Sequence, residues 1–345
     1  MDATTVAVDT AKLVFEVAEN EEAGRKRLRL SRPKFQDYVV KREKARFVME
    51  ACGGAHHWGR VMQRSGHEVR LLPVPYVSRY RLRNKTDRSD CDAMLEADRN
   101  PKILSVPVKS EQAQAIQGLH RLRSTWMASR TARINTLRGL LREFGVLLPV
   151  GAGAALKLIP EAIGNEAVPE LLRSGLHDML GEVHQLERRI VEIERQLGAI
   201  SRENETIERL RQISGIGLLT ATALYASAGD AKHFRSGRHL AAWLGLTPRE
   251  HSSGEVRRLG GITKKGDRYV RMLLTHGARS MLLHAGRMQR LGQELNYLQR
   301  WALELKARSN HNKATCALAN KLARIAWATW RYGRDFDPNH AAVAA

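Results

Sequence analysis

Four carboxylates occupy positions where apolar segments end or where a helix is expected to begin. Asp9 and Glu50 each follow a short apolar run with the composition of a strand. Asp87 and Asp90 are three residues apart at an expected helix start, so both side chains lie on one helix face. If the two strands are neighbours in one sheet, the four side chains converge at its carboxyl end, where they would hold two Mg²⁺ ions for in-line phosphoryl transfer. The alternative is structural: Asp9 would be a turn residue and Asp87 an N-cap.

Two adjacent serines, Ser252 and Ser253, lie in a polar, glycine-rich stretch over 247–266. A serine hydroxyl becomes a useful nucleophile only where a base or metal takes its proton and cations hold the anion. The alternative is a loop whose serines merely face solvent. The stretch and the residues directly after it supply the cations: Arg249, Arg257, Arg258, Lys264, Lys265, Arg268 and Arg271.

Two further motifs are weaker indications of function. The run 213–217 resembles the hairpin of helix-hairpin-helix DNA binders, although a plain turn between helices explains its glycines almost as well. His56 and His57 have no Cys or His at metal-ligand spacing, which favours a helix start or core packing.

The charge of the chain indicates its partner. Its 345 residues contain 57 Lys and Arg against 36 Asp and Glu, for a net charge of +21, and such an excess favours a polyanion such as nucleic acid. Three distant cysteines without a CxxC argue against a disulfide scaffold or a zinc ribbon and suit a reducing cytosol. No signal sequence and no apolar run of the ~18 residues that a membrane helix needs are found. We therefore expect a cytoplasmic protein that faces nucleic acid and no membrane.

The elements that must position the carboxylates alternate between strands and helices over 1–107. The expected order, two or three strands and then α, β, α, β, α, predicts a mixed sheet flanked by helices in an α/β domain. Strands are expected at 6–8, 14–17, 27–30, 46–49 and 69–74, and helices at 33–40, 57–63 and 87–97.

The segment 108–204 predicts two long amphipathic helices, one over 110–145 with a weak turn near Arg130 and one over about 176–197, joined by a linker at 151–160. Helices of this kind usually pair as an antiparallel or intermolecular coiled coil. The first lacks carboxylates over 112–142, which favours contact with phosphates over a merely solvated face. Its arginines are Arg121, Arg123, Arg130, Arg133, Arg138 and Arg142.

The remaining chain is expected to be mostly helical over 205–336, followed by a frayed tail over 337–345. The glycine-rich stretch with the two serines interrupts its helices. Helices are expected at 205–212, 218–226, 238–244, 267–283 and 313–330.

Together, the runs 8–12, 50–53, 84–90 and 245–267 resemble the DEDD transposases of the insertion-sequence group numbered one-ten. The runs 53–58 and 260–262 are similar to its eleven-eleven branch. The resemblance covers nearly the whole chain. It implies a RuvC-like RNase H fold for 1–107, a coiled coil for 108–204 and a C-terminal transposase domain for 205–336.

The same resemblance implies a function and its residues. It places the catalytic, Mg²⁺-binding carboxylates at Asp9, Glu50, Asp87 and Asp90, and the catalytic serine at Ser253. It implies an RNA-guided DNA recombinase of the bacterial cytosol and nucleoid that excises and inserts its element. Its partners would be the DNA of the element ends and target and a structured bridge or seek RNA. It would assemble as a homo-oligomer, dimer to tetramer, with active sites combined from two protomers.

Two other functions remain open from the residues. A metal-only RuvC-like nuclease would cut DNA junctions by water attack, with Ser253 as a bystander. A non-enzymatic architectural protein would bind nucleic acid, with the carboxylates acting as caps. Only the serine recombinase would form a covalent adduct between protein and DNA.

Overall fold

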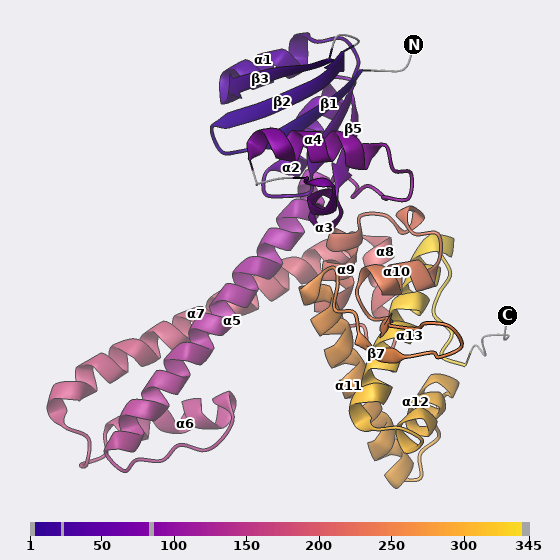
Figure 1. Ribbon diagram of the computed structural model, residues 1–345. Coiled ribbons are helices and arrows are strands. Elements are labelled where there is room, and N and C mark those ends of the chain that lie inside the picture. The colour runs from indigo at the N-terminus through magenta and orange to yellow at the C-terminus, as the bar shows by residue number, and fades with distance from the viewer. Residues whose placement is uncertain (1–3, 22–23, 83–85, 340–345) are drawn as a thin grey trace. The chain divides into compact units, whose positions relative to one another are not determined.

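Five strands form a mixed sheet in the N-terminal part of the chain, in the order β3-β2-β1-β4-β5, as the computed structural model shows (Figure 1). The first three strands pair antiparallel, as successive strands joined by short turns do. β4 runs parallel to both β1 and β5, which requires helical crossovers. The strands are β1 (Thr5–Thr10), β2 (Val14–Glu21), β3 (Gly24–Ser31), β4 (Arg46–Glu50) and β5 (Glu68–Leu72).

The structure describes residues 4–21, 24–82 and 86–339. The chain divides after Glu111 into two compact units, each with its own hydrophobic core. The expected mixed α/β architecture with a helical C-terminal part is confirmed. Over the described ranges, no helix has both the length and the apolar character needed to cross a membrane.

Helices cover both faces of the sheet. α1 (Arg32–Lys41) and α2 (Ala55–Arg64) pack on one face through Phe35 and Trp58. α4 (Asp87–Asp98) packs on the other face through Cys91 and Met94. The strand expected at 69–74 ends two residues early because Pro73 begins a turn of helix, α3 (Val74–Val77), followed by the 3₁₀ turn η1 (Ser78–Tyr80).

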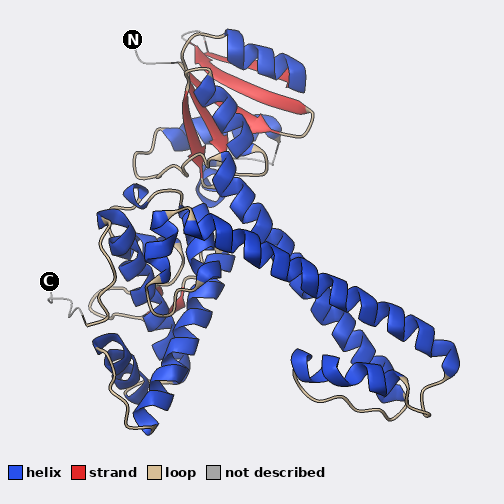
Figure 2. Ribbon diagram, turned by 180° about the vertical axis from the view of Figure 1, so that it is seen from behind, coloured by secondary structure: helices blue, strands red, loops and turns tan. Residues whose placement is uncertain are grey.

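The second unit begins with an antiparallel helix pair. α5 (Glu111–Glu143) is one continuous helix through Arg130, so the prediction of a weak turn at that residue is wrong. It packs against α7 (Glu170–Arg202) through an apolar cluster that includes Leu137 and Val183. The linker expected at 151–160 is instead a helix, α6 (Ala152–Ile163), because Ile159 and its apolar neighbours bury against the same cluster. Figure 2 shows this unit as almost entirely helical.

The rest of the unit packs around one apolar core. It contains two helical segments that were not expected, the 3₁₀ turn η2 and the helix α12. Its helices are α8 (Glu205–Arg211), α9 (Leu218–Ala228), η2 (Ala231–His233), α10 (Gly237–Trp243), α11 (Arg268–Arg290), α12 (Tyr297–Ala307) and α13 (His311–Tyr332), and its strands are β6 (Pro248–Glu250) and β7 (Leu259–Ile262).

The glycine turn at 213–217 connects α8 to α9 and packs directly on α11. Gly215 has a φ of +91°, and a Cβ at Gly277 would lie 1.9 Å from the Gly215 carbonyl oxygen. This contact between two backbones requires both glycines without any bound phosphate, which favours the plain helix-helix turn.

A buried histidine joins three helices of this unit. His120 of α5 is 3% exposed, and its ring nitrogens lie 3.0 Å from Thr222 Oγ1 of α9 and 3.1 Å from Tyr269 Oη of α11. Burial, with a smaller contribution from the charge of Arg123, lowers the pKa of His120 to about 4, against an opposing effect of the Asp267 charge. The ring is therefore neutral at pH 7.

We expect acid to destabilise the second unit through His120. Because its pKa is about 4 in the folded chain and 6.5 when exposed, the unfolded chain binds more protons between these values. The free energy of unfolding should therefore fall as pH drops from 6.5 to 4, by up to about 3 kcal/mol from this residue. Urea denaturation at several pH values should show a smaller pH slope for His120→Gln. An unchanged slope would contradict the assignment.

Candidate active site

Asp9 and Glu50 lie side by side at the ends of the two central strands. β1 and β4 are parallel, and their last registered pair is Val8 with Met49, so Asp9 and Glu50 occupy the next positions. Residues two positions earlier on each strand pack into the core beneath α4. Since side chains alternate along a strand, both carboxylates extend from the α4 face of the sheet. The Oε1 atom of Glu50 is buried.

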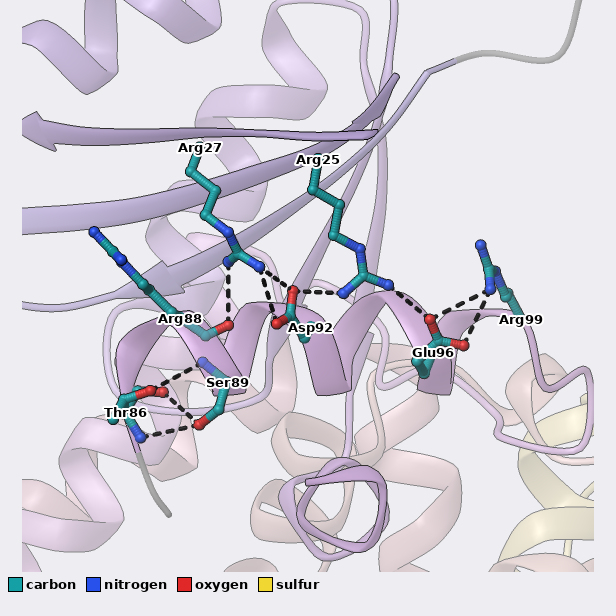
Figure 3. Close-up of polar contacts among 8 residues, drawn as sticks. All are labelled: Arg25, Arg27, Thr86, Arg88, Ser89, Asp92, Glu96 and Arg99. Carbon is teal, nitrogen blue, oxygen red and sulfur yellow. Dashed lines mark hydrogen bonds and ion pairs between the residues drawn. The ribbon is translucent and has the colours of Figure 1, made fainter. Parts of the chain in front are cut away.

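α4 begins with a capping box that uses neither of its N-terminal aspartates as the cap. The Thr86 hydroxyl accepts from the Ser89 amide at 3.2 Å, and the Ser89 hydroxyl accepts from the Thr86 amide at 3.0 Å (Figure 3). Thr86, rather than Asp87, therefore caps the helix. Asp87 and Asp90 both lie in the first turn, where the helix dipole favours negative charge.

The two α4 aspartates have different surroundings. Asp90 is 6% exposed and accepts a hydrogen bond from Arg81 Nε at 2.5 Å. Asp87 is exposed and lines a hollow of about 320 Å³ together with Glu16 and Arg27.

Over residues 4–21, 24–82 and 86–339, no three His, Cys, Asp or Glu side chains are arranged to hold a metal ion. The structure thus brings Asp9 and Glu50 together, but it does not arrange the expected four carboxylates into a ready metal site. Crowded carboxylates repel one another unless a cation lies between them, and the Arg81 guanidinium supplies that positive charge at Asp90.

Sequence reasoning missed the acidic and thiol neighbours of Asp9. Glu16 of β2 lies opposite Asp9 in the antiparallel register, and its carbonyl accepts from Cys91 Sγ at 3.4 Å. Burial is the main reason that the pKa of the Cys91 thiol is raised to about 12; a hydrogen bond with the Asp9 backbone lowers it, and the Asp9 charge raises it. Cys91 is therefore a neutral packing residue. The hairpin register was the signal that could have placed Glu16 beside Asp9.

Carboxylates on the opposite face of α4 form ion pairs with arginines of β3. Asp92 Oδ1 accepts from Arg25 Nη1 at 2.5 Å and from Arg27 Nη2 at 2.7 Å, and Glu96 pairs with Arg25 at 2.7 Å (Figure 3). Asp92 thus lies toward β3, and it provides a matched control for the carboxylates of the site.

The serines occupy the tip of the β6–β7 hairpin. The His251 amide donates to the Arg258 carbonyl at 2.9 Å, and Ser253 and Val256 exchange backbone hydrogen bonds of 3.2 and 3.1 Å. Gly254 completes the turn with a φ of +57°, a conformation that favours glycine. The turn exposes both serines.

The two hydroxyls differ in their bonding. Ser252 Oγ donates to Glu250 Oε1 at 2.8 Å and accepts from the Arg258 amide at 3.1 Å, so it holds the hairpin together. The Ser253 hydroxyl, by contrast, is exposed and makes no side-chain hydrogen bond to any described residue. Of the two hydroxyls, only that of Ser252 is therefore bonded within the hairpin.

The base of the loop is fixed while its tip is open. Arg271 Nη1 donates to the carbonyls of Leu244 at 3.0 Å and Lys265 at 2.9 Å. A Cβ at Gly266 would lie 1.8 Å from the Trp243 carbonyl oxygen, so the segment between β7 and α11 needs glycine there. Of the expected phosphate-binding cations, Arg257 pairs with a hairpin carboxylate at 3.4 Å. Arg257 is nevertheless exposed, as are Arg249, Arg258, Lys264, Lys265 and Arg268.

Most arginines of α5 meet partners within the second unit. Three of them form ion pairs with glutamates of α7, and backbone carbonyls of a loop accept hydrogen bonds from a fourth. These partners cannot be predicted from the local sequence of α5. The pairs are Arg123–Glu194 at 2.7 Å, Arg130–Glu187 at 2.9 Å, Arg133–Glu182, and Arg138 with the carbonyls of Pro149 and Gly151. Arg121 and Arg142 are exposed. The face expected to carry one sign of charge is thus partly neutralised by α7, and its contact with phosphates stays a prediction.

These features define a class of protein. A strongly basic chain carries adjacent carboxylates at the ends of the central strands of a mixed sheet, and a separate unit carries a serine on a cation-rich hairpin. Both groups of residues suit chemistry on phosphodiesters, and the chain is in this sense a nucleic-acid-processing protein.

Comparison with known proteins gives the family. Residues 6–146 match a transposase family of the DEDD IS110 type, and residues 207–293 match the transposase IS116/IS110/IS902 family. The chain belongs to the IS110 family of transposases, which act as DNA recombinases. The resemblance drawn from its motifs is confirmed.

Three relatives illustrate this membership. The chain is 40% identical to a probable family 20 transposase of Pseudomonas aeruginosa, over 95% of this chain and 97% of the relative. It is 36% identical to the transposase for insertion sequence element IS1111A of Coxiella burnetii, over 95% and 89%. It is 27% identical to a pilin gene-inverting protein of Moraxella bovis, over 52% and 54%.

Proposed function

We propose that the chain excises and inserts its element by RNA-guided strand exchange, with Ser253 as the nucleophile and Asp9, Glu50, Asp87 and Asp90 as a Mg²⁺-binding site. The observation that carries this proposal is the exposed Ser253 hydroxyl at a hairpin tip among cations, beside a Ser252 already bonded within the hairpin. The pilin gene-inverting relative supports a reaction that rejoins DNA strands.

The proposed serine step exchanges one phosphodiester bond for another and therefore needs no external energy source. The Ser253 Oγ would attack a backbone phosphorus and lose its proton, a serine–DNA phosphodiester would form, and the DNA oxygen on the far side would leave and take up a proton. A DNA hydroxyl can then attack the serine ester and rejoin the strands, because the ester preserves the energy of the bond. Arg249 and Arg258 would hold the phosphate oxygens, which guanidinium groups grip with paired hydrogen bonds.

The donor chemistry of the acidic site fits Mg²⁺, which prefers carboxylate oxygens. Asp9 and the partly buried Glu50 supply two such groups from neighbouring strands, and α4 supplies Asp87 and Asp90. Bound there, the ion would stabilise negative charge on phosphate oxygens. Arg81 would have to give up its hydrogen bond for Asp90 to become a ligand. A RuvC-like RNase H fold is the architecture that we propose for this sheet and its helices.

Sequencing the RNA that co-purifies with the protein tests the guided part of the proposal. We expect one structured RNA, encoded beside the gene, to be enriched over the RNA retained by an unrelated protein of equal charge. The chain would assemble with this RNA and with DNA as a homo-oligomer, dimer to tetramer. Recovery of bulk cellular RNA alone, in proportion to its abundance, would contradict RNA guidance while leaving the DNA chemistry open.

A further inference from the structure

α11 is, like α13, a long helix of the second unit that carries cationic side chains and no carboxylate. Over Arg268–Arg290 it contains five arginines and two histidines and no carboxylate. Its buried side is apolar and packs into the core through residues such as Val270, Leu274 and Ala278. The polar residues therefore project from the other side of a well-anchored helix.

Four of the arginines share one exposed face. At 3.6 residues per turn, Arg268, Arg279, Arg287 and Arg290 fall within about 100° of arc, opposite the buried side. We call these four residues the α11 basic face. At a rise of 1.5 Å per residue it is about 33 Å long.

The charges of this face have no local compensation. Over residues 4–21, 24–82 and 86–339, no carboxylate lies within ion-pair distance of any of the four guanidinium groups, in contrast to the α5 arginines paired with α7. Four uncompensated guanidinium groups on one rigid helix create a strip of positive potential. Duplex DNA presents about one negative charge per 1.7 Å of its axis, and one turn spans about 34 Å. The strip therefore matches one turn of duplex in length and is opposite in charge.

We propose that the α11 basic face binds the phosphate backbone of duplex DNA. The position of the face favours DNA, the substrate of this family, because α11 begins directly after the loop that carries Ser253 and fixes that loop through Arg271. The face would hold the duplex while the hairpin meets the scissile phosphate. The proposal deepens the proposed function and needs DNA as substrate, but it does not depend on the serine chemistry.

The test compares two triple variants of equal charge change. Arg279, Arg287 and Arg290 are replaced by glutamine in the first, and the exposed α7 residues Arg188, Arg195 and Arg202 in the second. Anisotropy of a labelled 30-base-pair duplex is measured against salt in EDTA, so that no metal-dependent cleavage intervenes. Each lost phosphate contact should lower the log–log salt slope by about 0.9, so the first variant should lose about 2 to 3 and the control should match the wild type.

Each other outcome overturns the proposal. An unchanged salt slope in the α11 variant would show that the face makes no phosphate contacts. A lower slope seen only with an RNA duplex would assign the face to RNA binding. A changed oligomer in sedimentation with an unchanged DNA slope makes the face an interface between copies. Should the triple variant unfold, Arg279→Gln alone should lower the slope by about 0.9. Failure of the serine mechanism would abolish adducts and leave these slopes intact, so the two proposals fail separately.

Discussion

Asp9→Ala is expected to abolish strand cleavage, by at least about a thousandfold, while DNA affinity changes by less than about threefold. Asp9 shares the end of the central strands with Glu50, so its removal takes away a carboxylate from the centre of the proposed Mg²⁺ site. Cleavage of a labelled element end in Mg²⁺ and binding of the same DNA in EDTA measure the two effects separately.

Asp92→Ala is the matched control for this experiment. It removes a carboxylate of the same helix that carries Asp90, but Asp92 is bound to Arg25 and Arg27 on β3. Loss of these partly exposed ion pairs should cost about 1 kcal/mol or less, with nearly full cleavage. Full cleavage by Asp9→Ala, or equal losses in both variants, would refute the assignment of the acidic site.

Ser253→Ala is expected to eliminate the covalent protein–DNA adduct while leaving assembly and DNA binding intact. The exposed Ser253 hydroxyl makes no side-chain bond to a described residue, so its loss should not disturb the hairpin. Denaturing gels of reactions with labelled DNA report the adduct as a species of reduced mobility.

Ser252→Ala provides the comparison, with most activity retained. It deletes the hydrogen bonds to Glu250 and to the Arg258 amide, which should loosen the hairpin by about 1 kcal/mol and reduce the rate by a modest factor. Adducts from Ser253→Ala but not from Ser252→Ala would move the nucleophile by one residue. Adducts from both variants would exclude a serine mechanism at this loop.

Local patterns in the sequence were sufficient to predict the sheet and the positions of Asp9 and Glu50 at the ends of its strands. Both carboxylates end short apolar runs, and parallel neighbours place such ends together. Glu16 was missed because its place beside Asp9 depends on the register of β1 with β2, which is a contact between strands. Arg81 was missed for a similar reason, since it lies nine residues before Asp90 and outside the helix that carries this aspartate.

In the second unit, too, contacts between distant parts of the sequence were not predicted. The periodicity of α5 and α7 predicted two long helices, but the glutamates that neutralise Arg123 and Arg133 lie 71 and 49 residues away in the sequence. Glycines and Pro160 made α6 resemble a linker, whereas burial against the α5–α7 cluster makes it a helix. Tertiary contacts, which no local window contains, decided both cases.

The central claim, a serine that carries the cut DNA strand, is tested most directly by mapping the adduct. Trypsin and nuclease digestion should release the peptide 250–257, which contains both serines, and fragmentation mass spectrometry locates the attached nucleotide. We predict a nucleotide phosphate on Ser253. Mg²⁺-dependent cleavage with no nucleotide on any serine of this peptide would contradict the account and identify the chain as a metal-only nuclease.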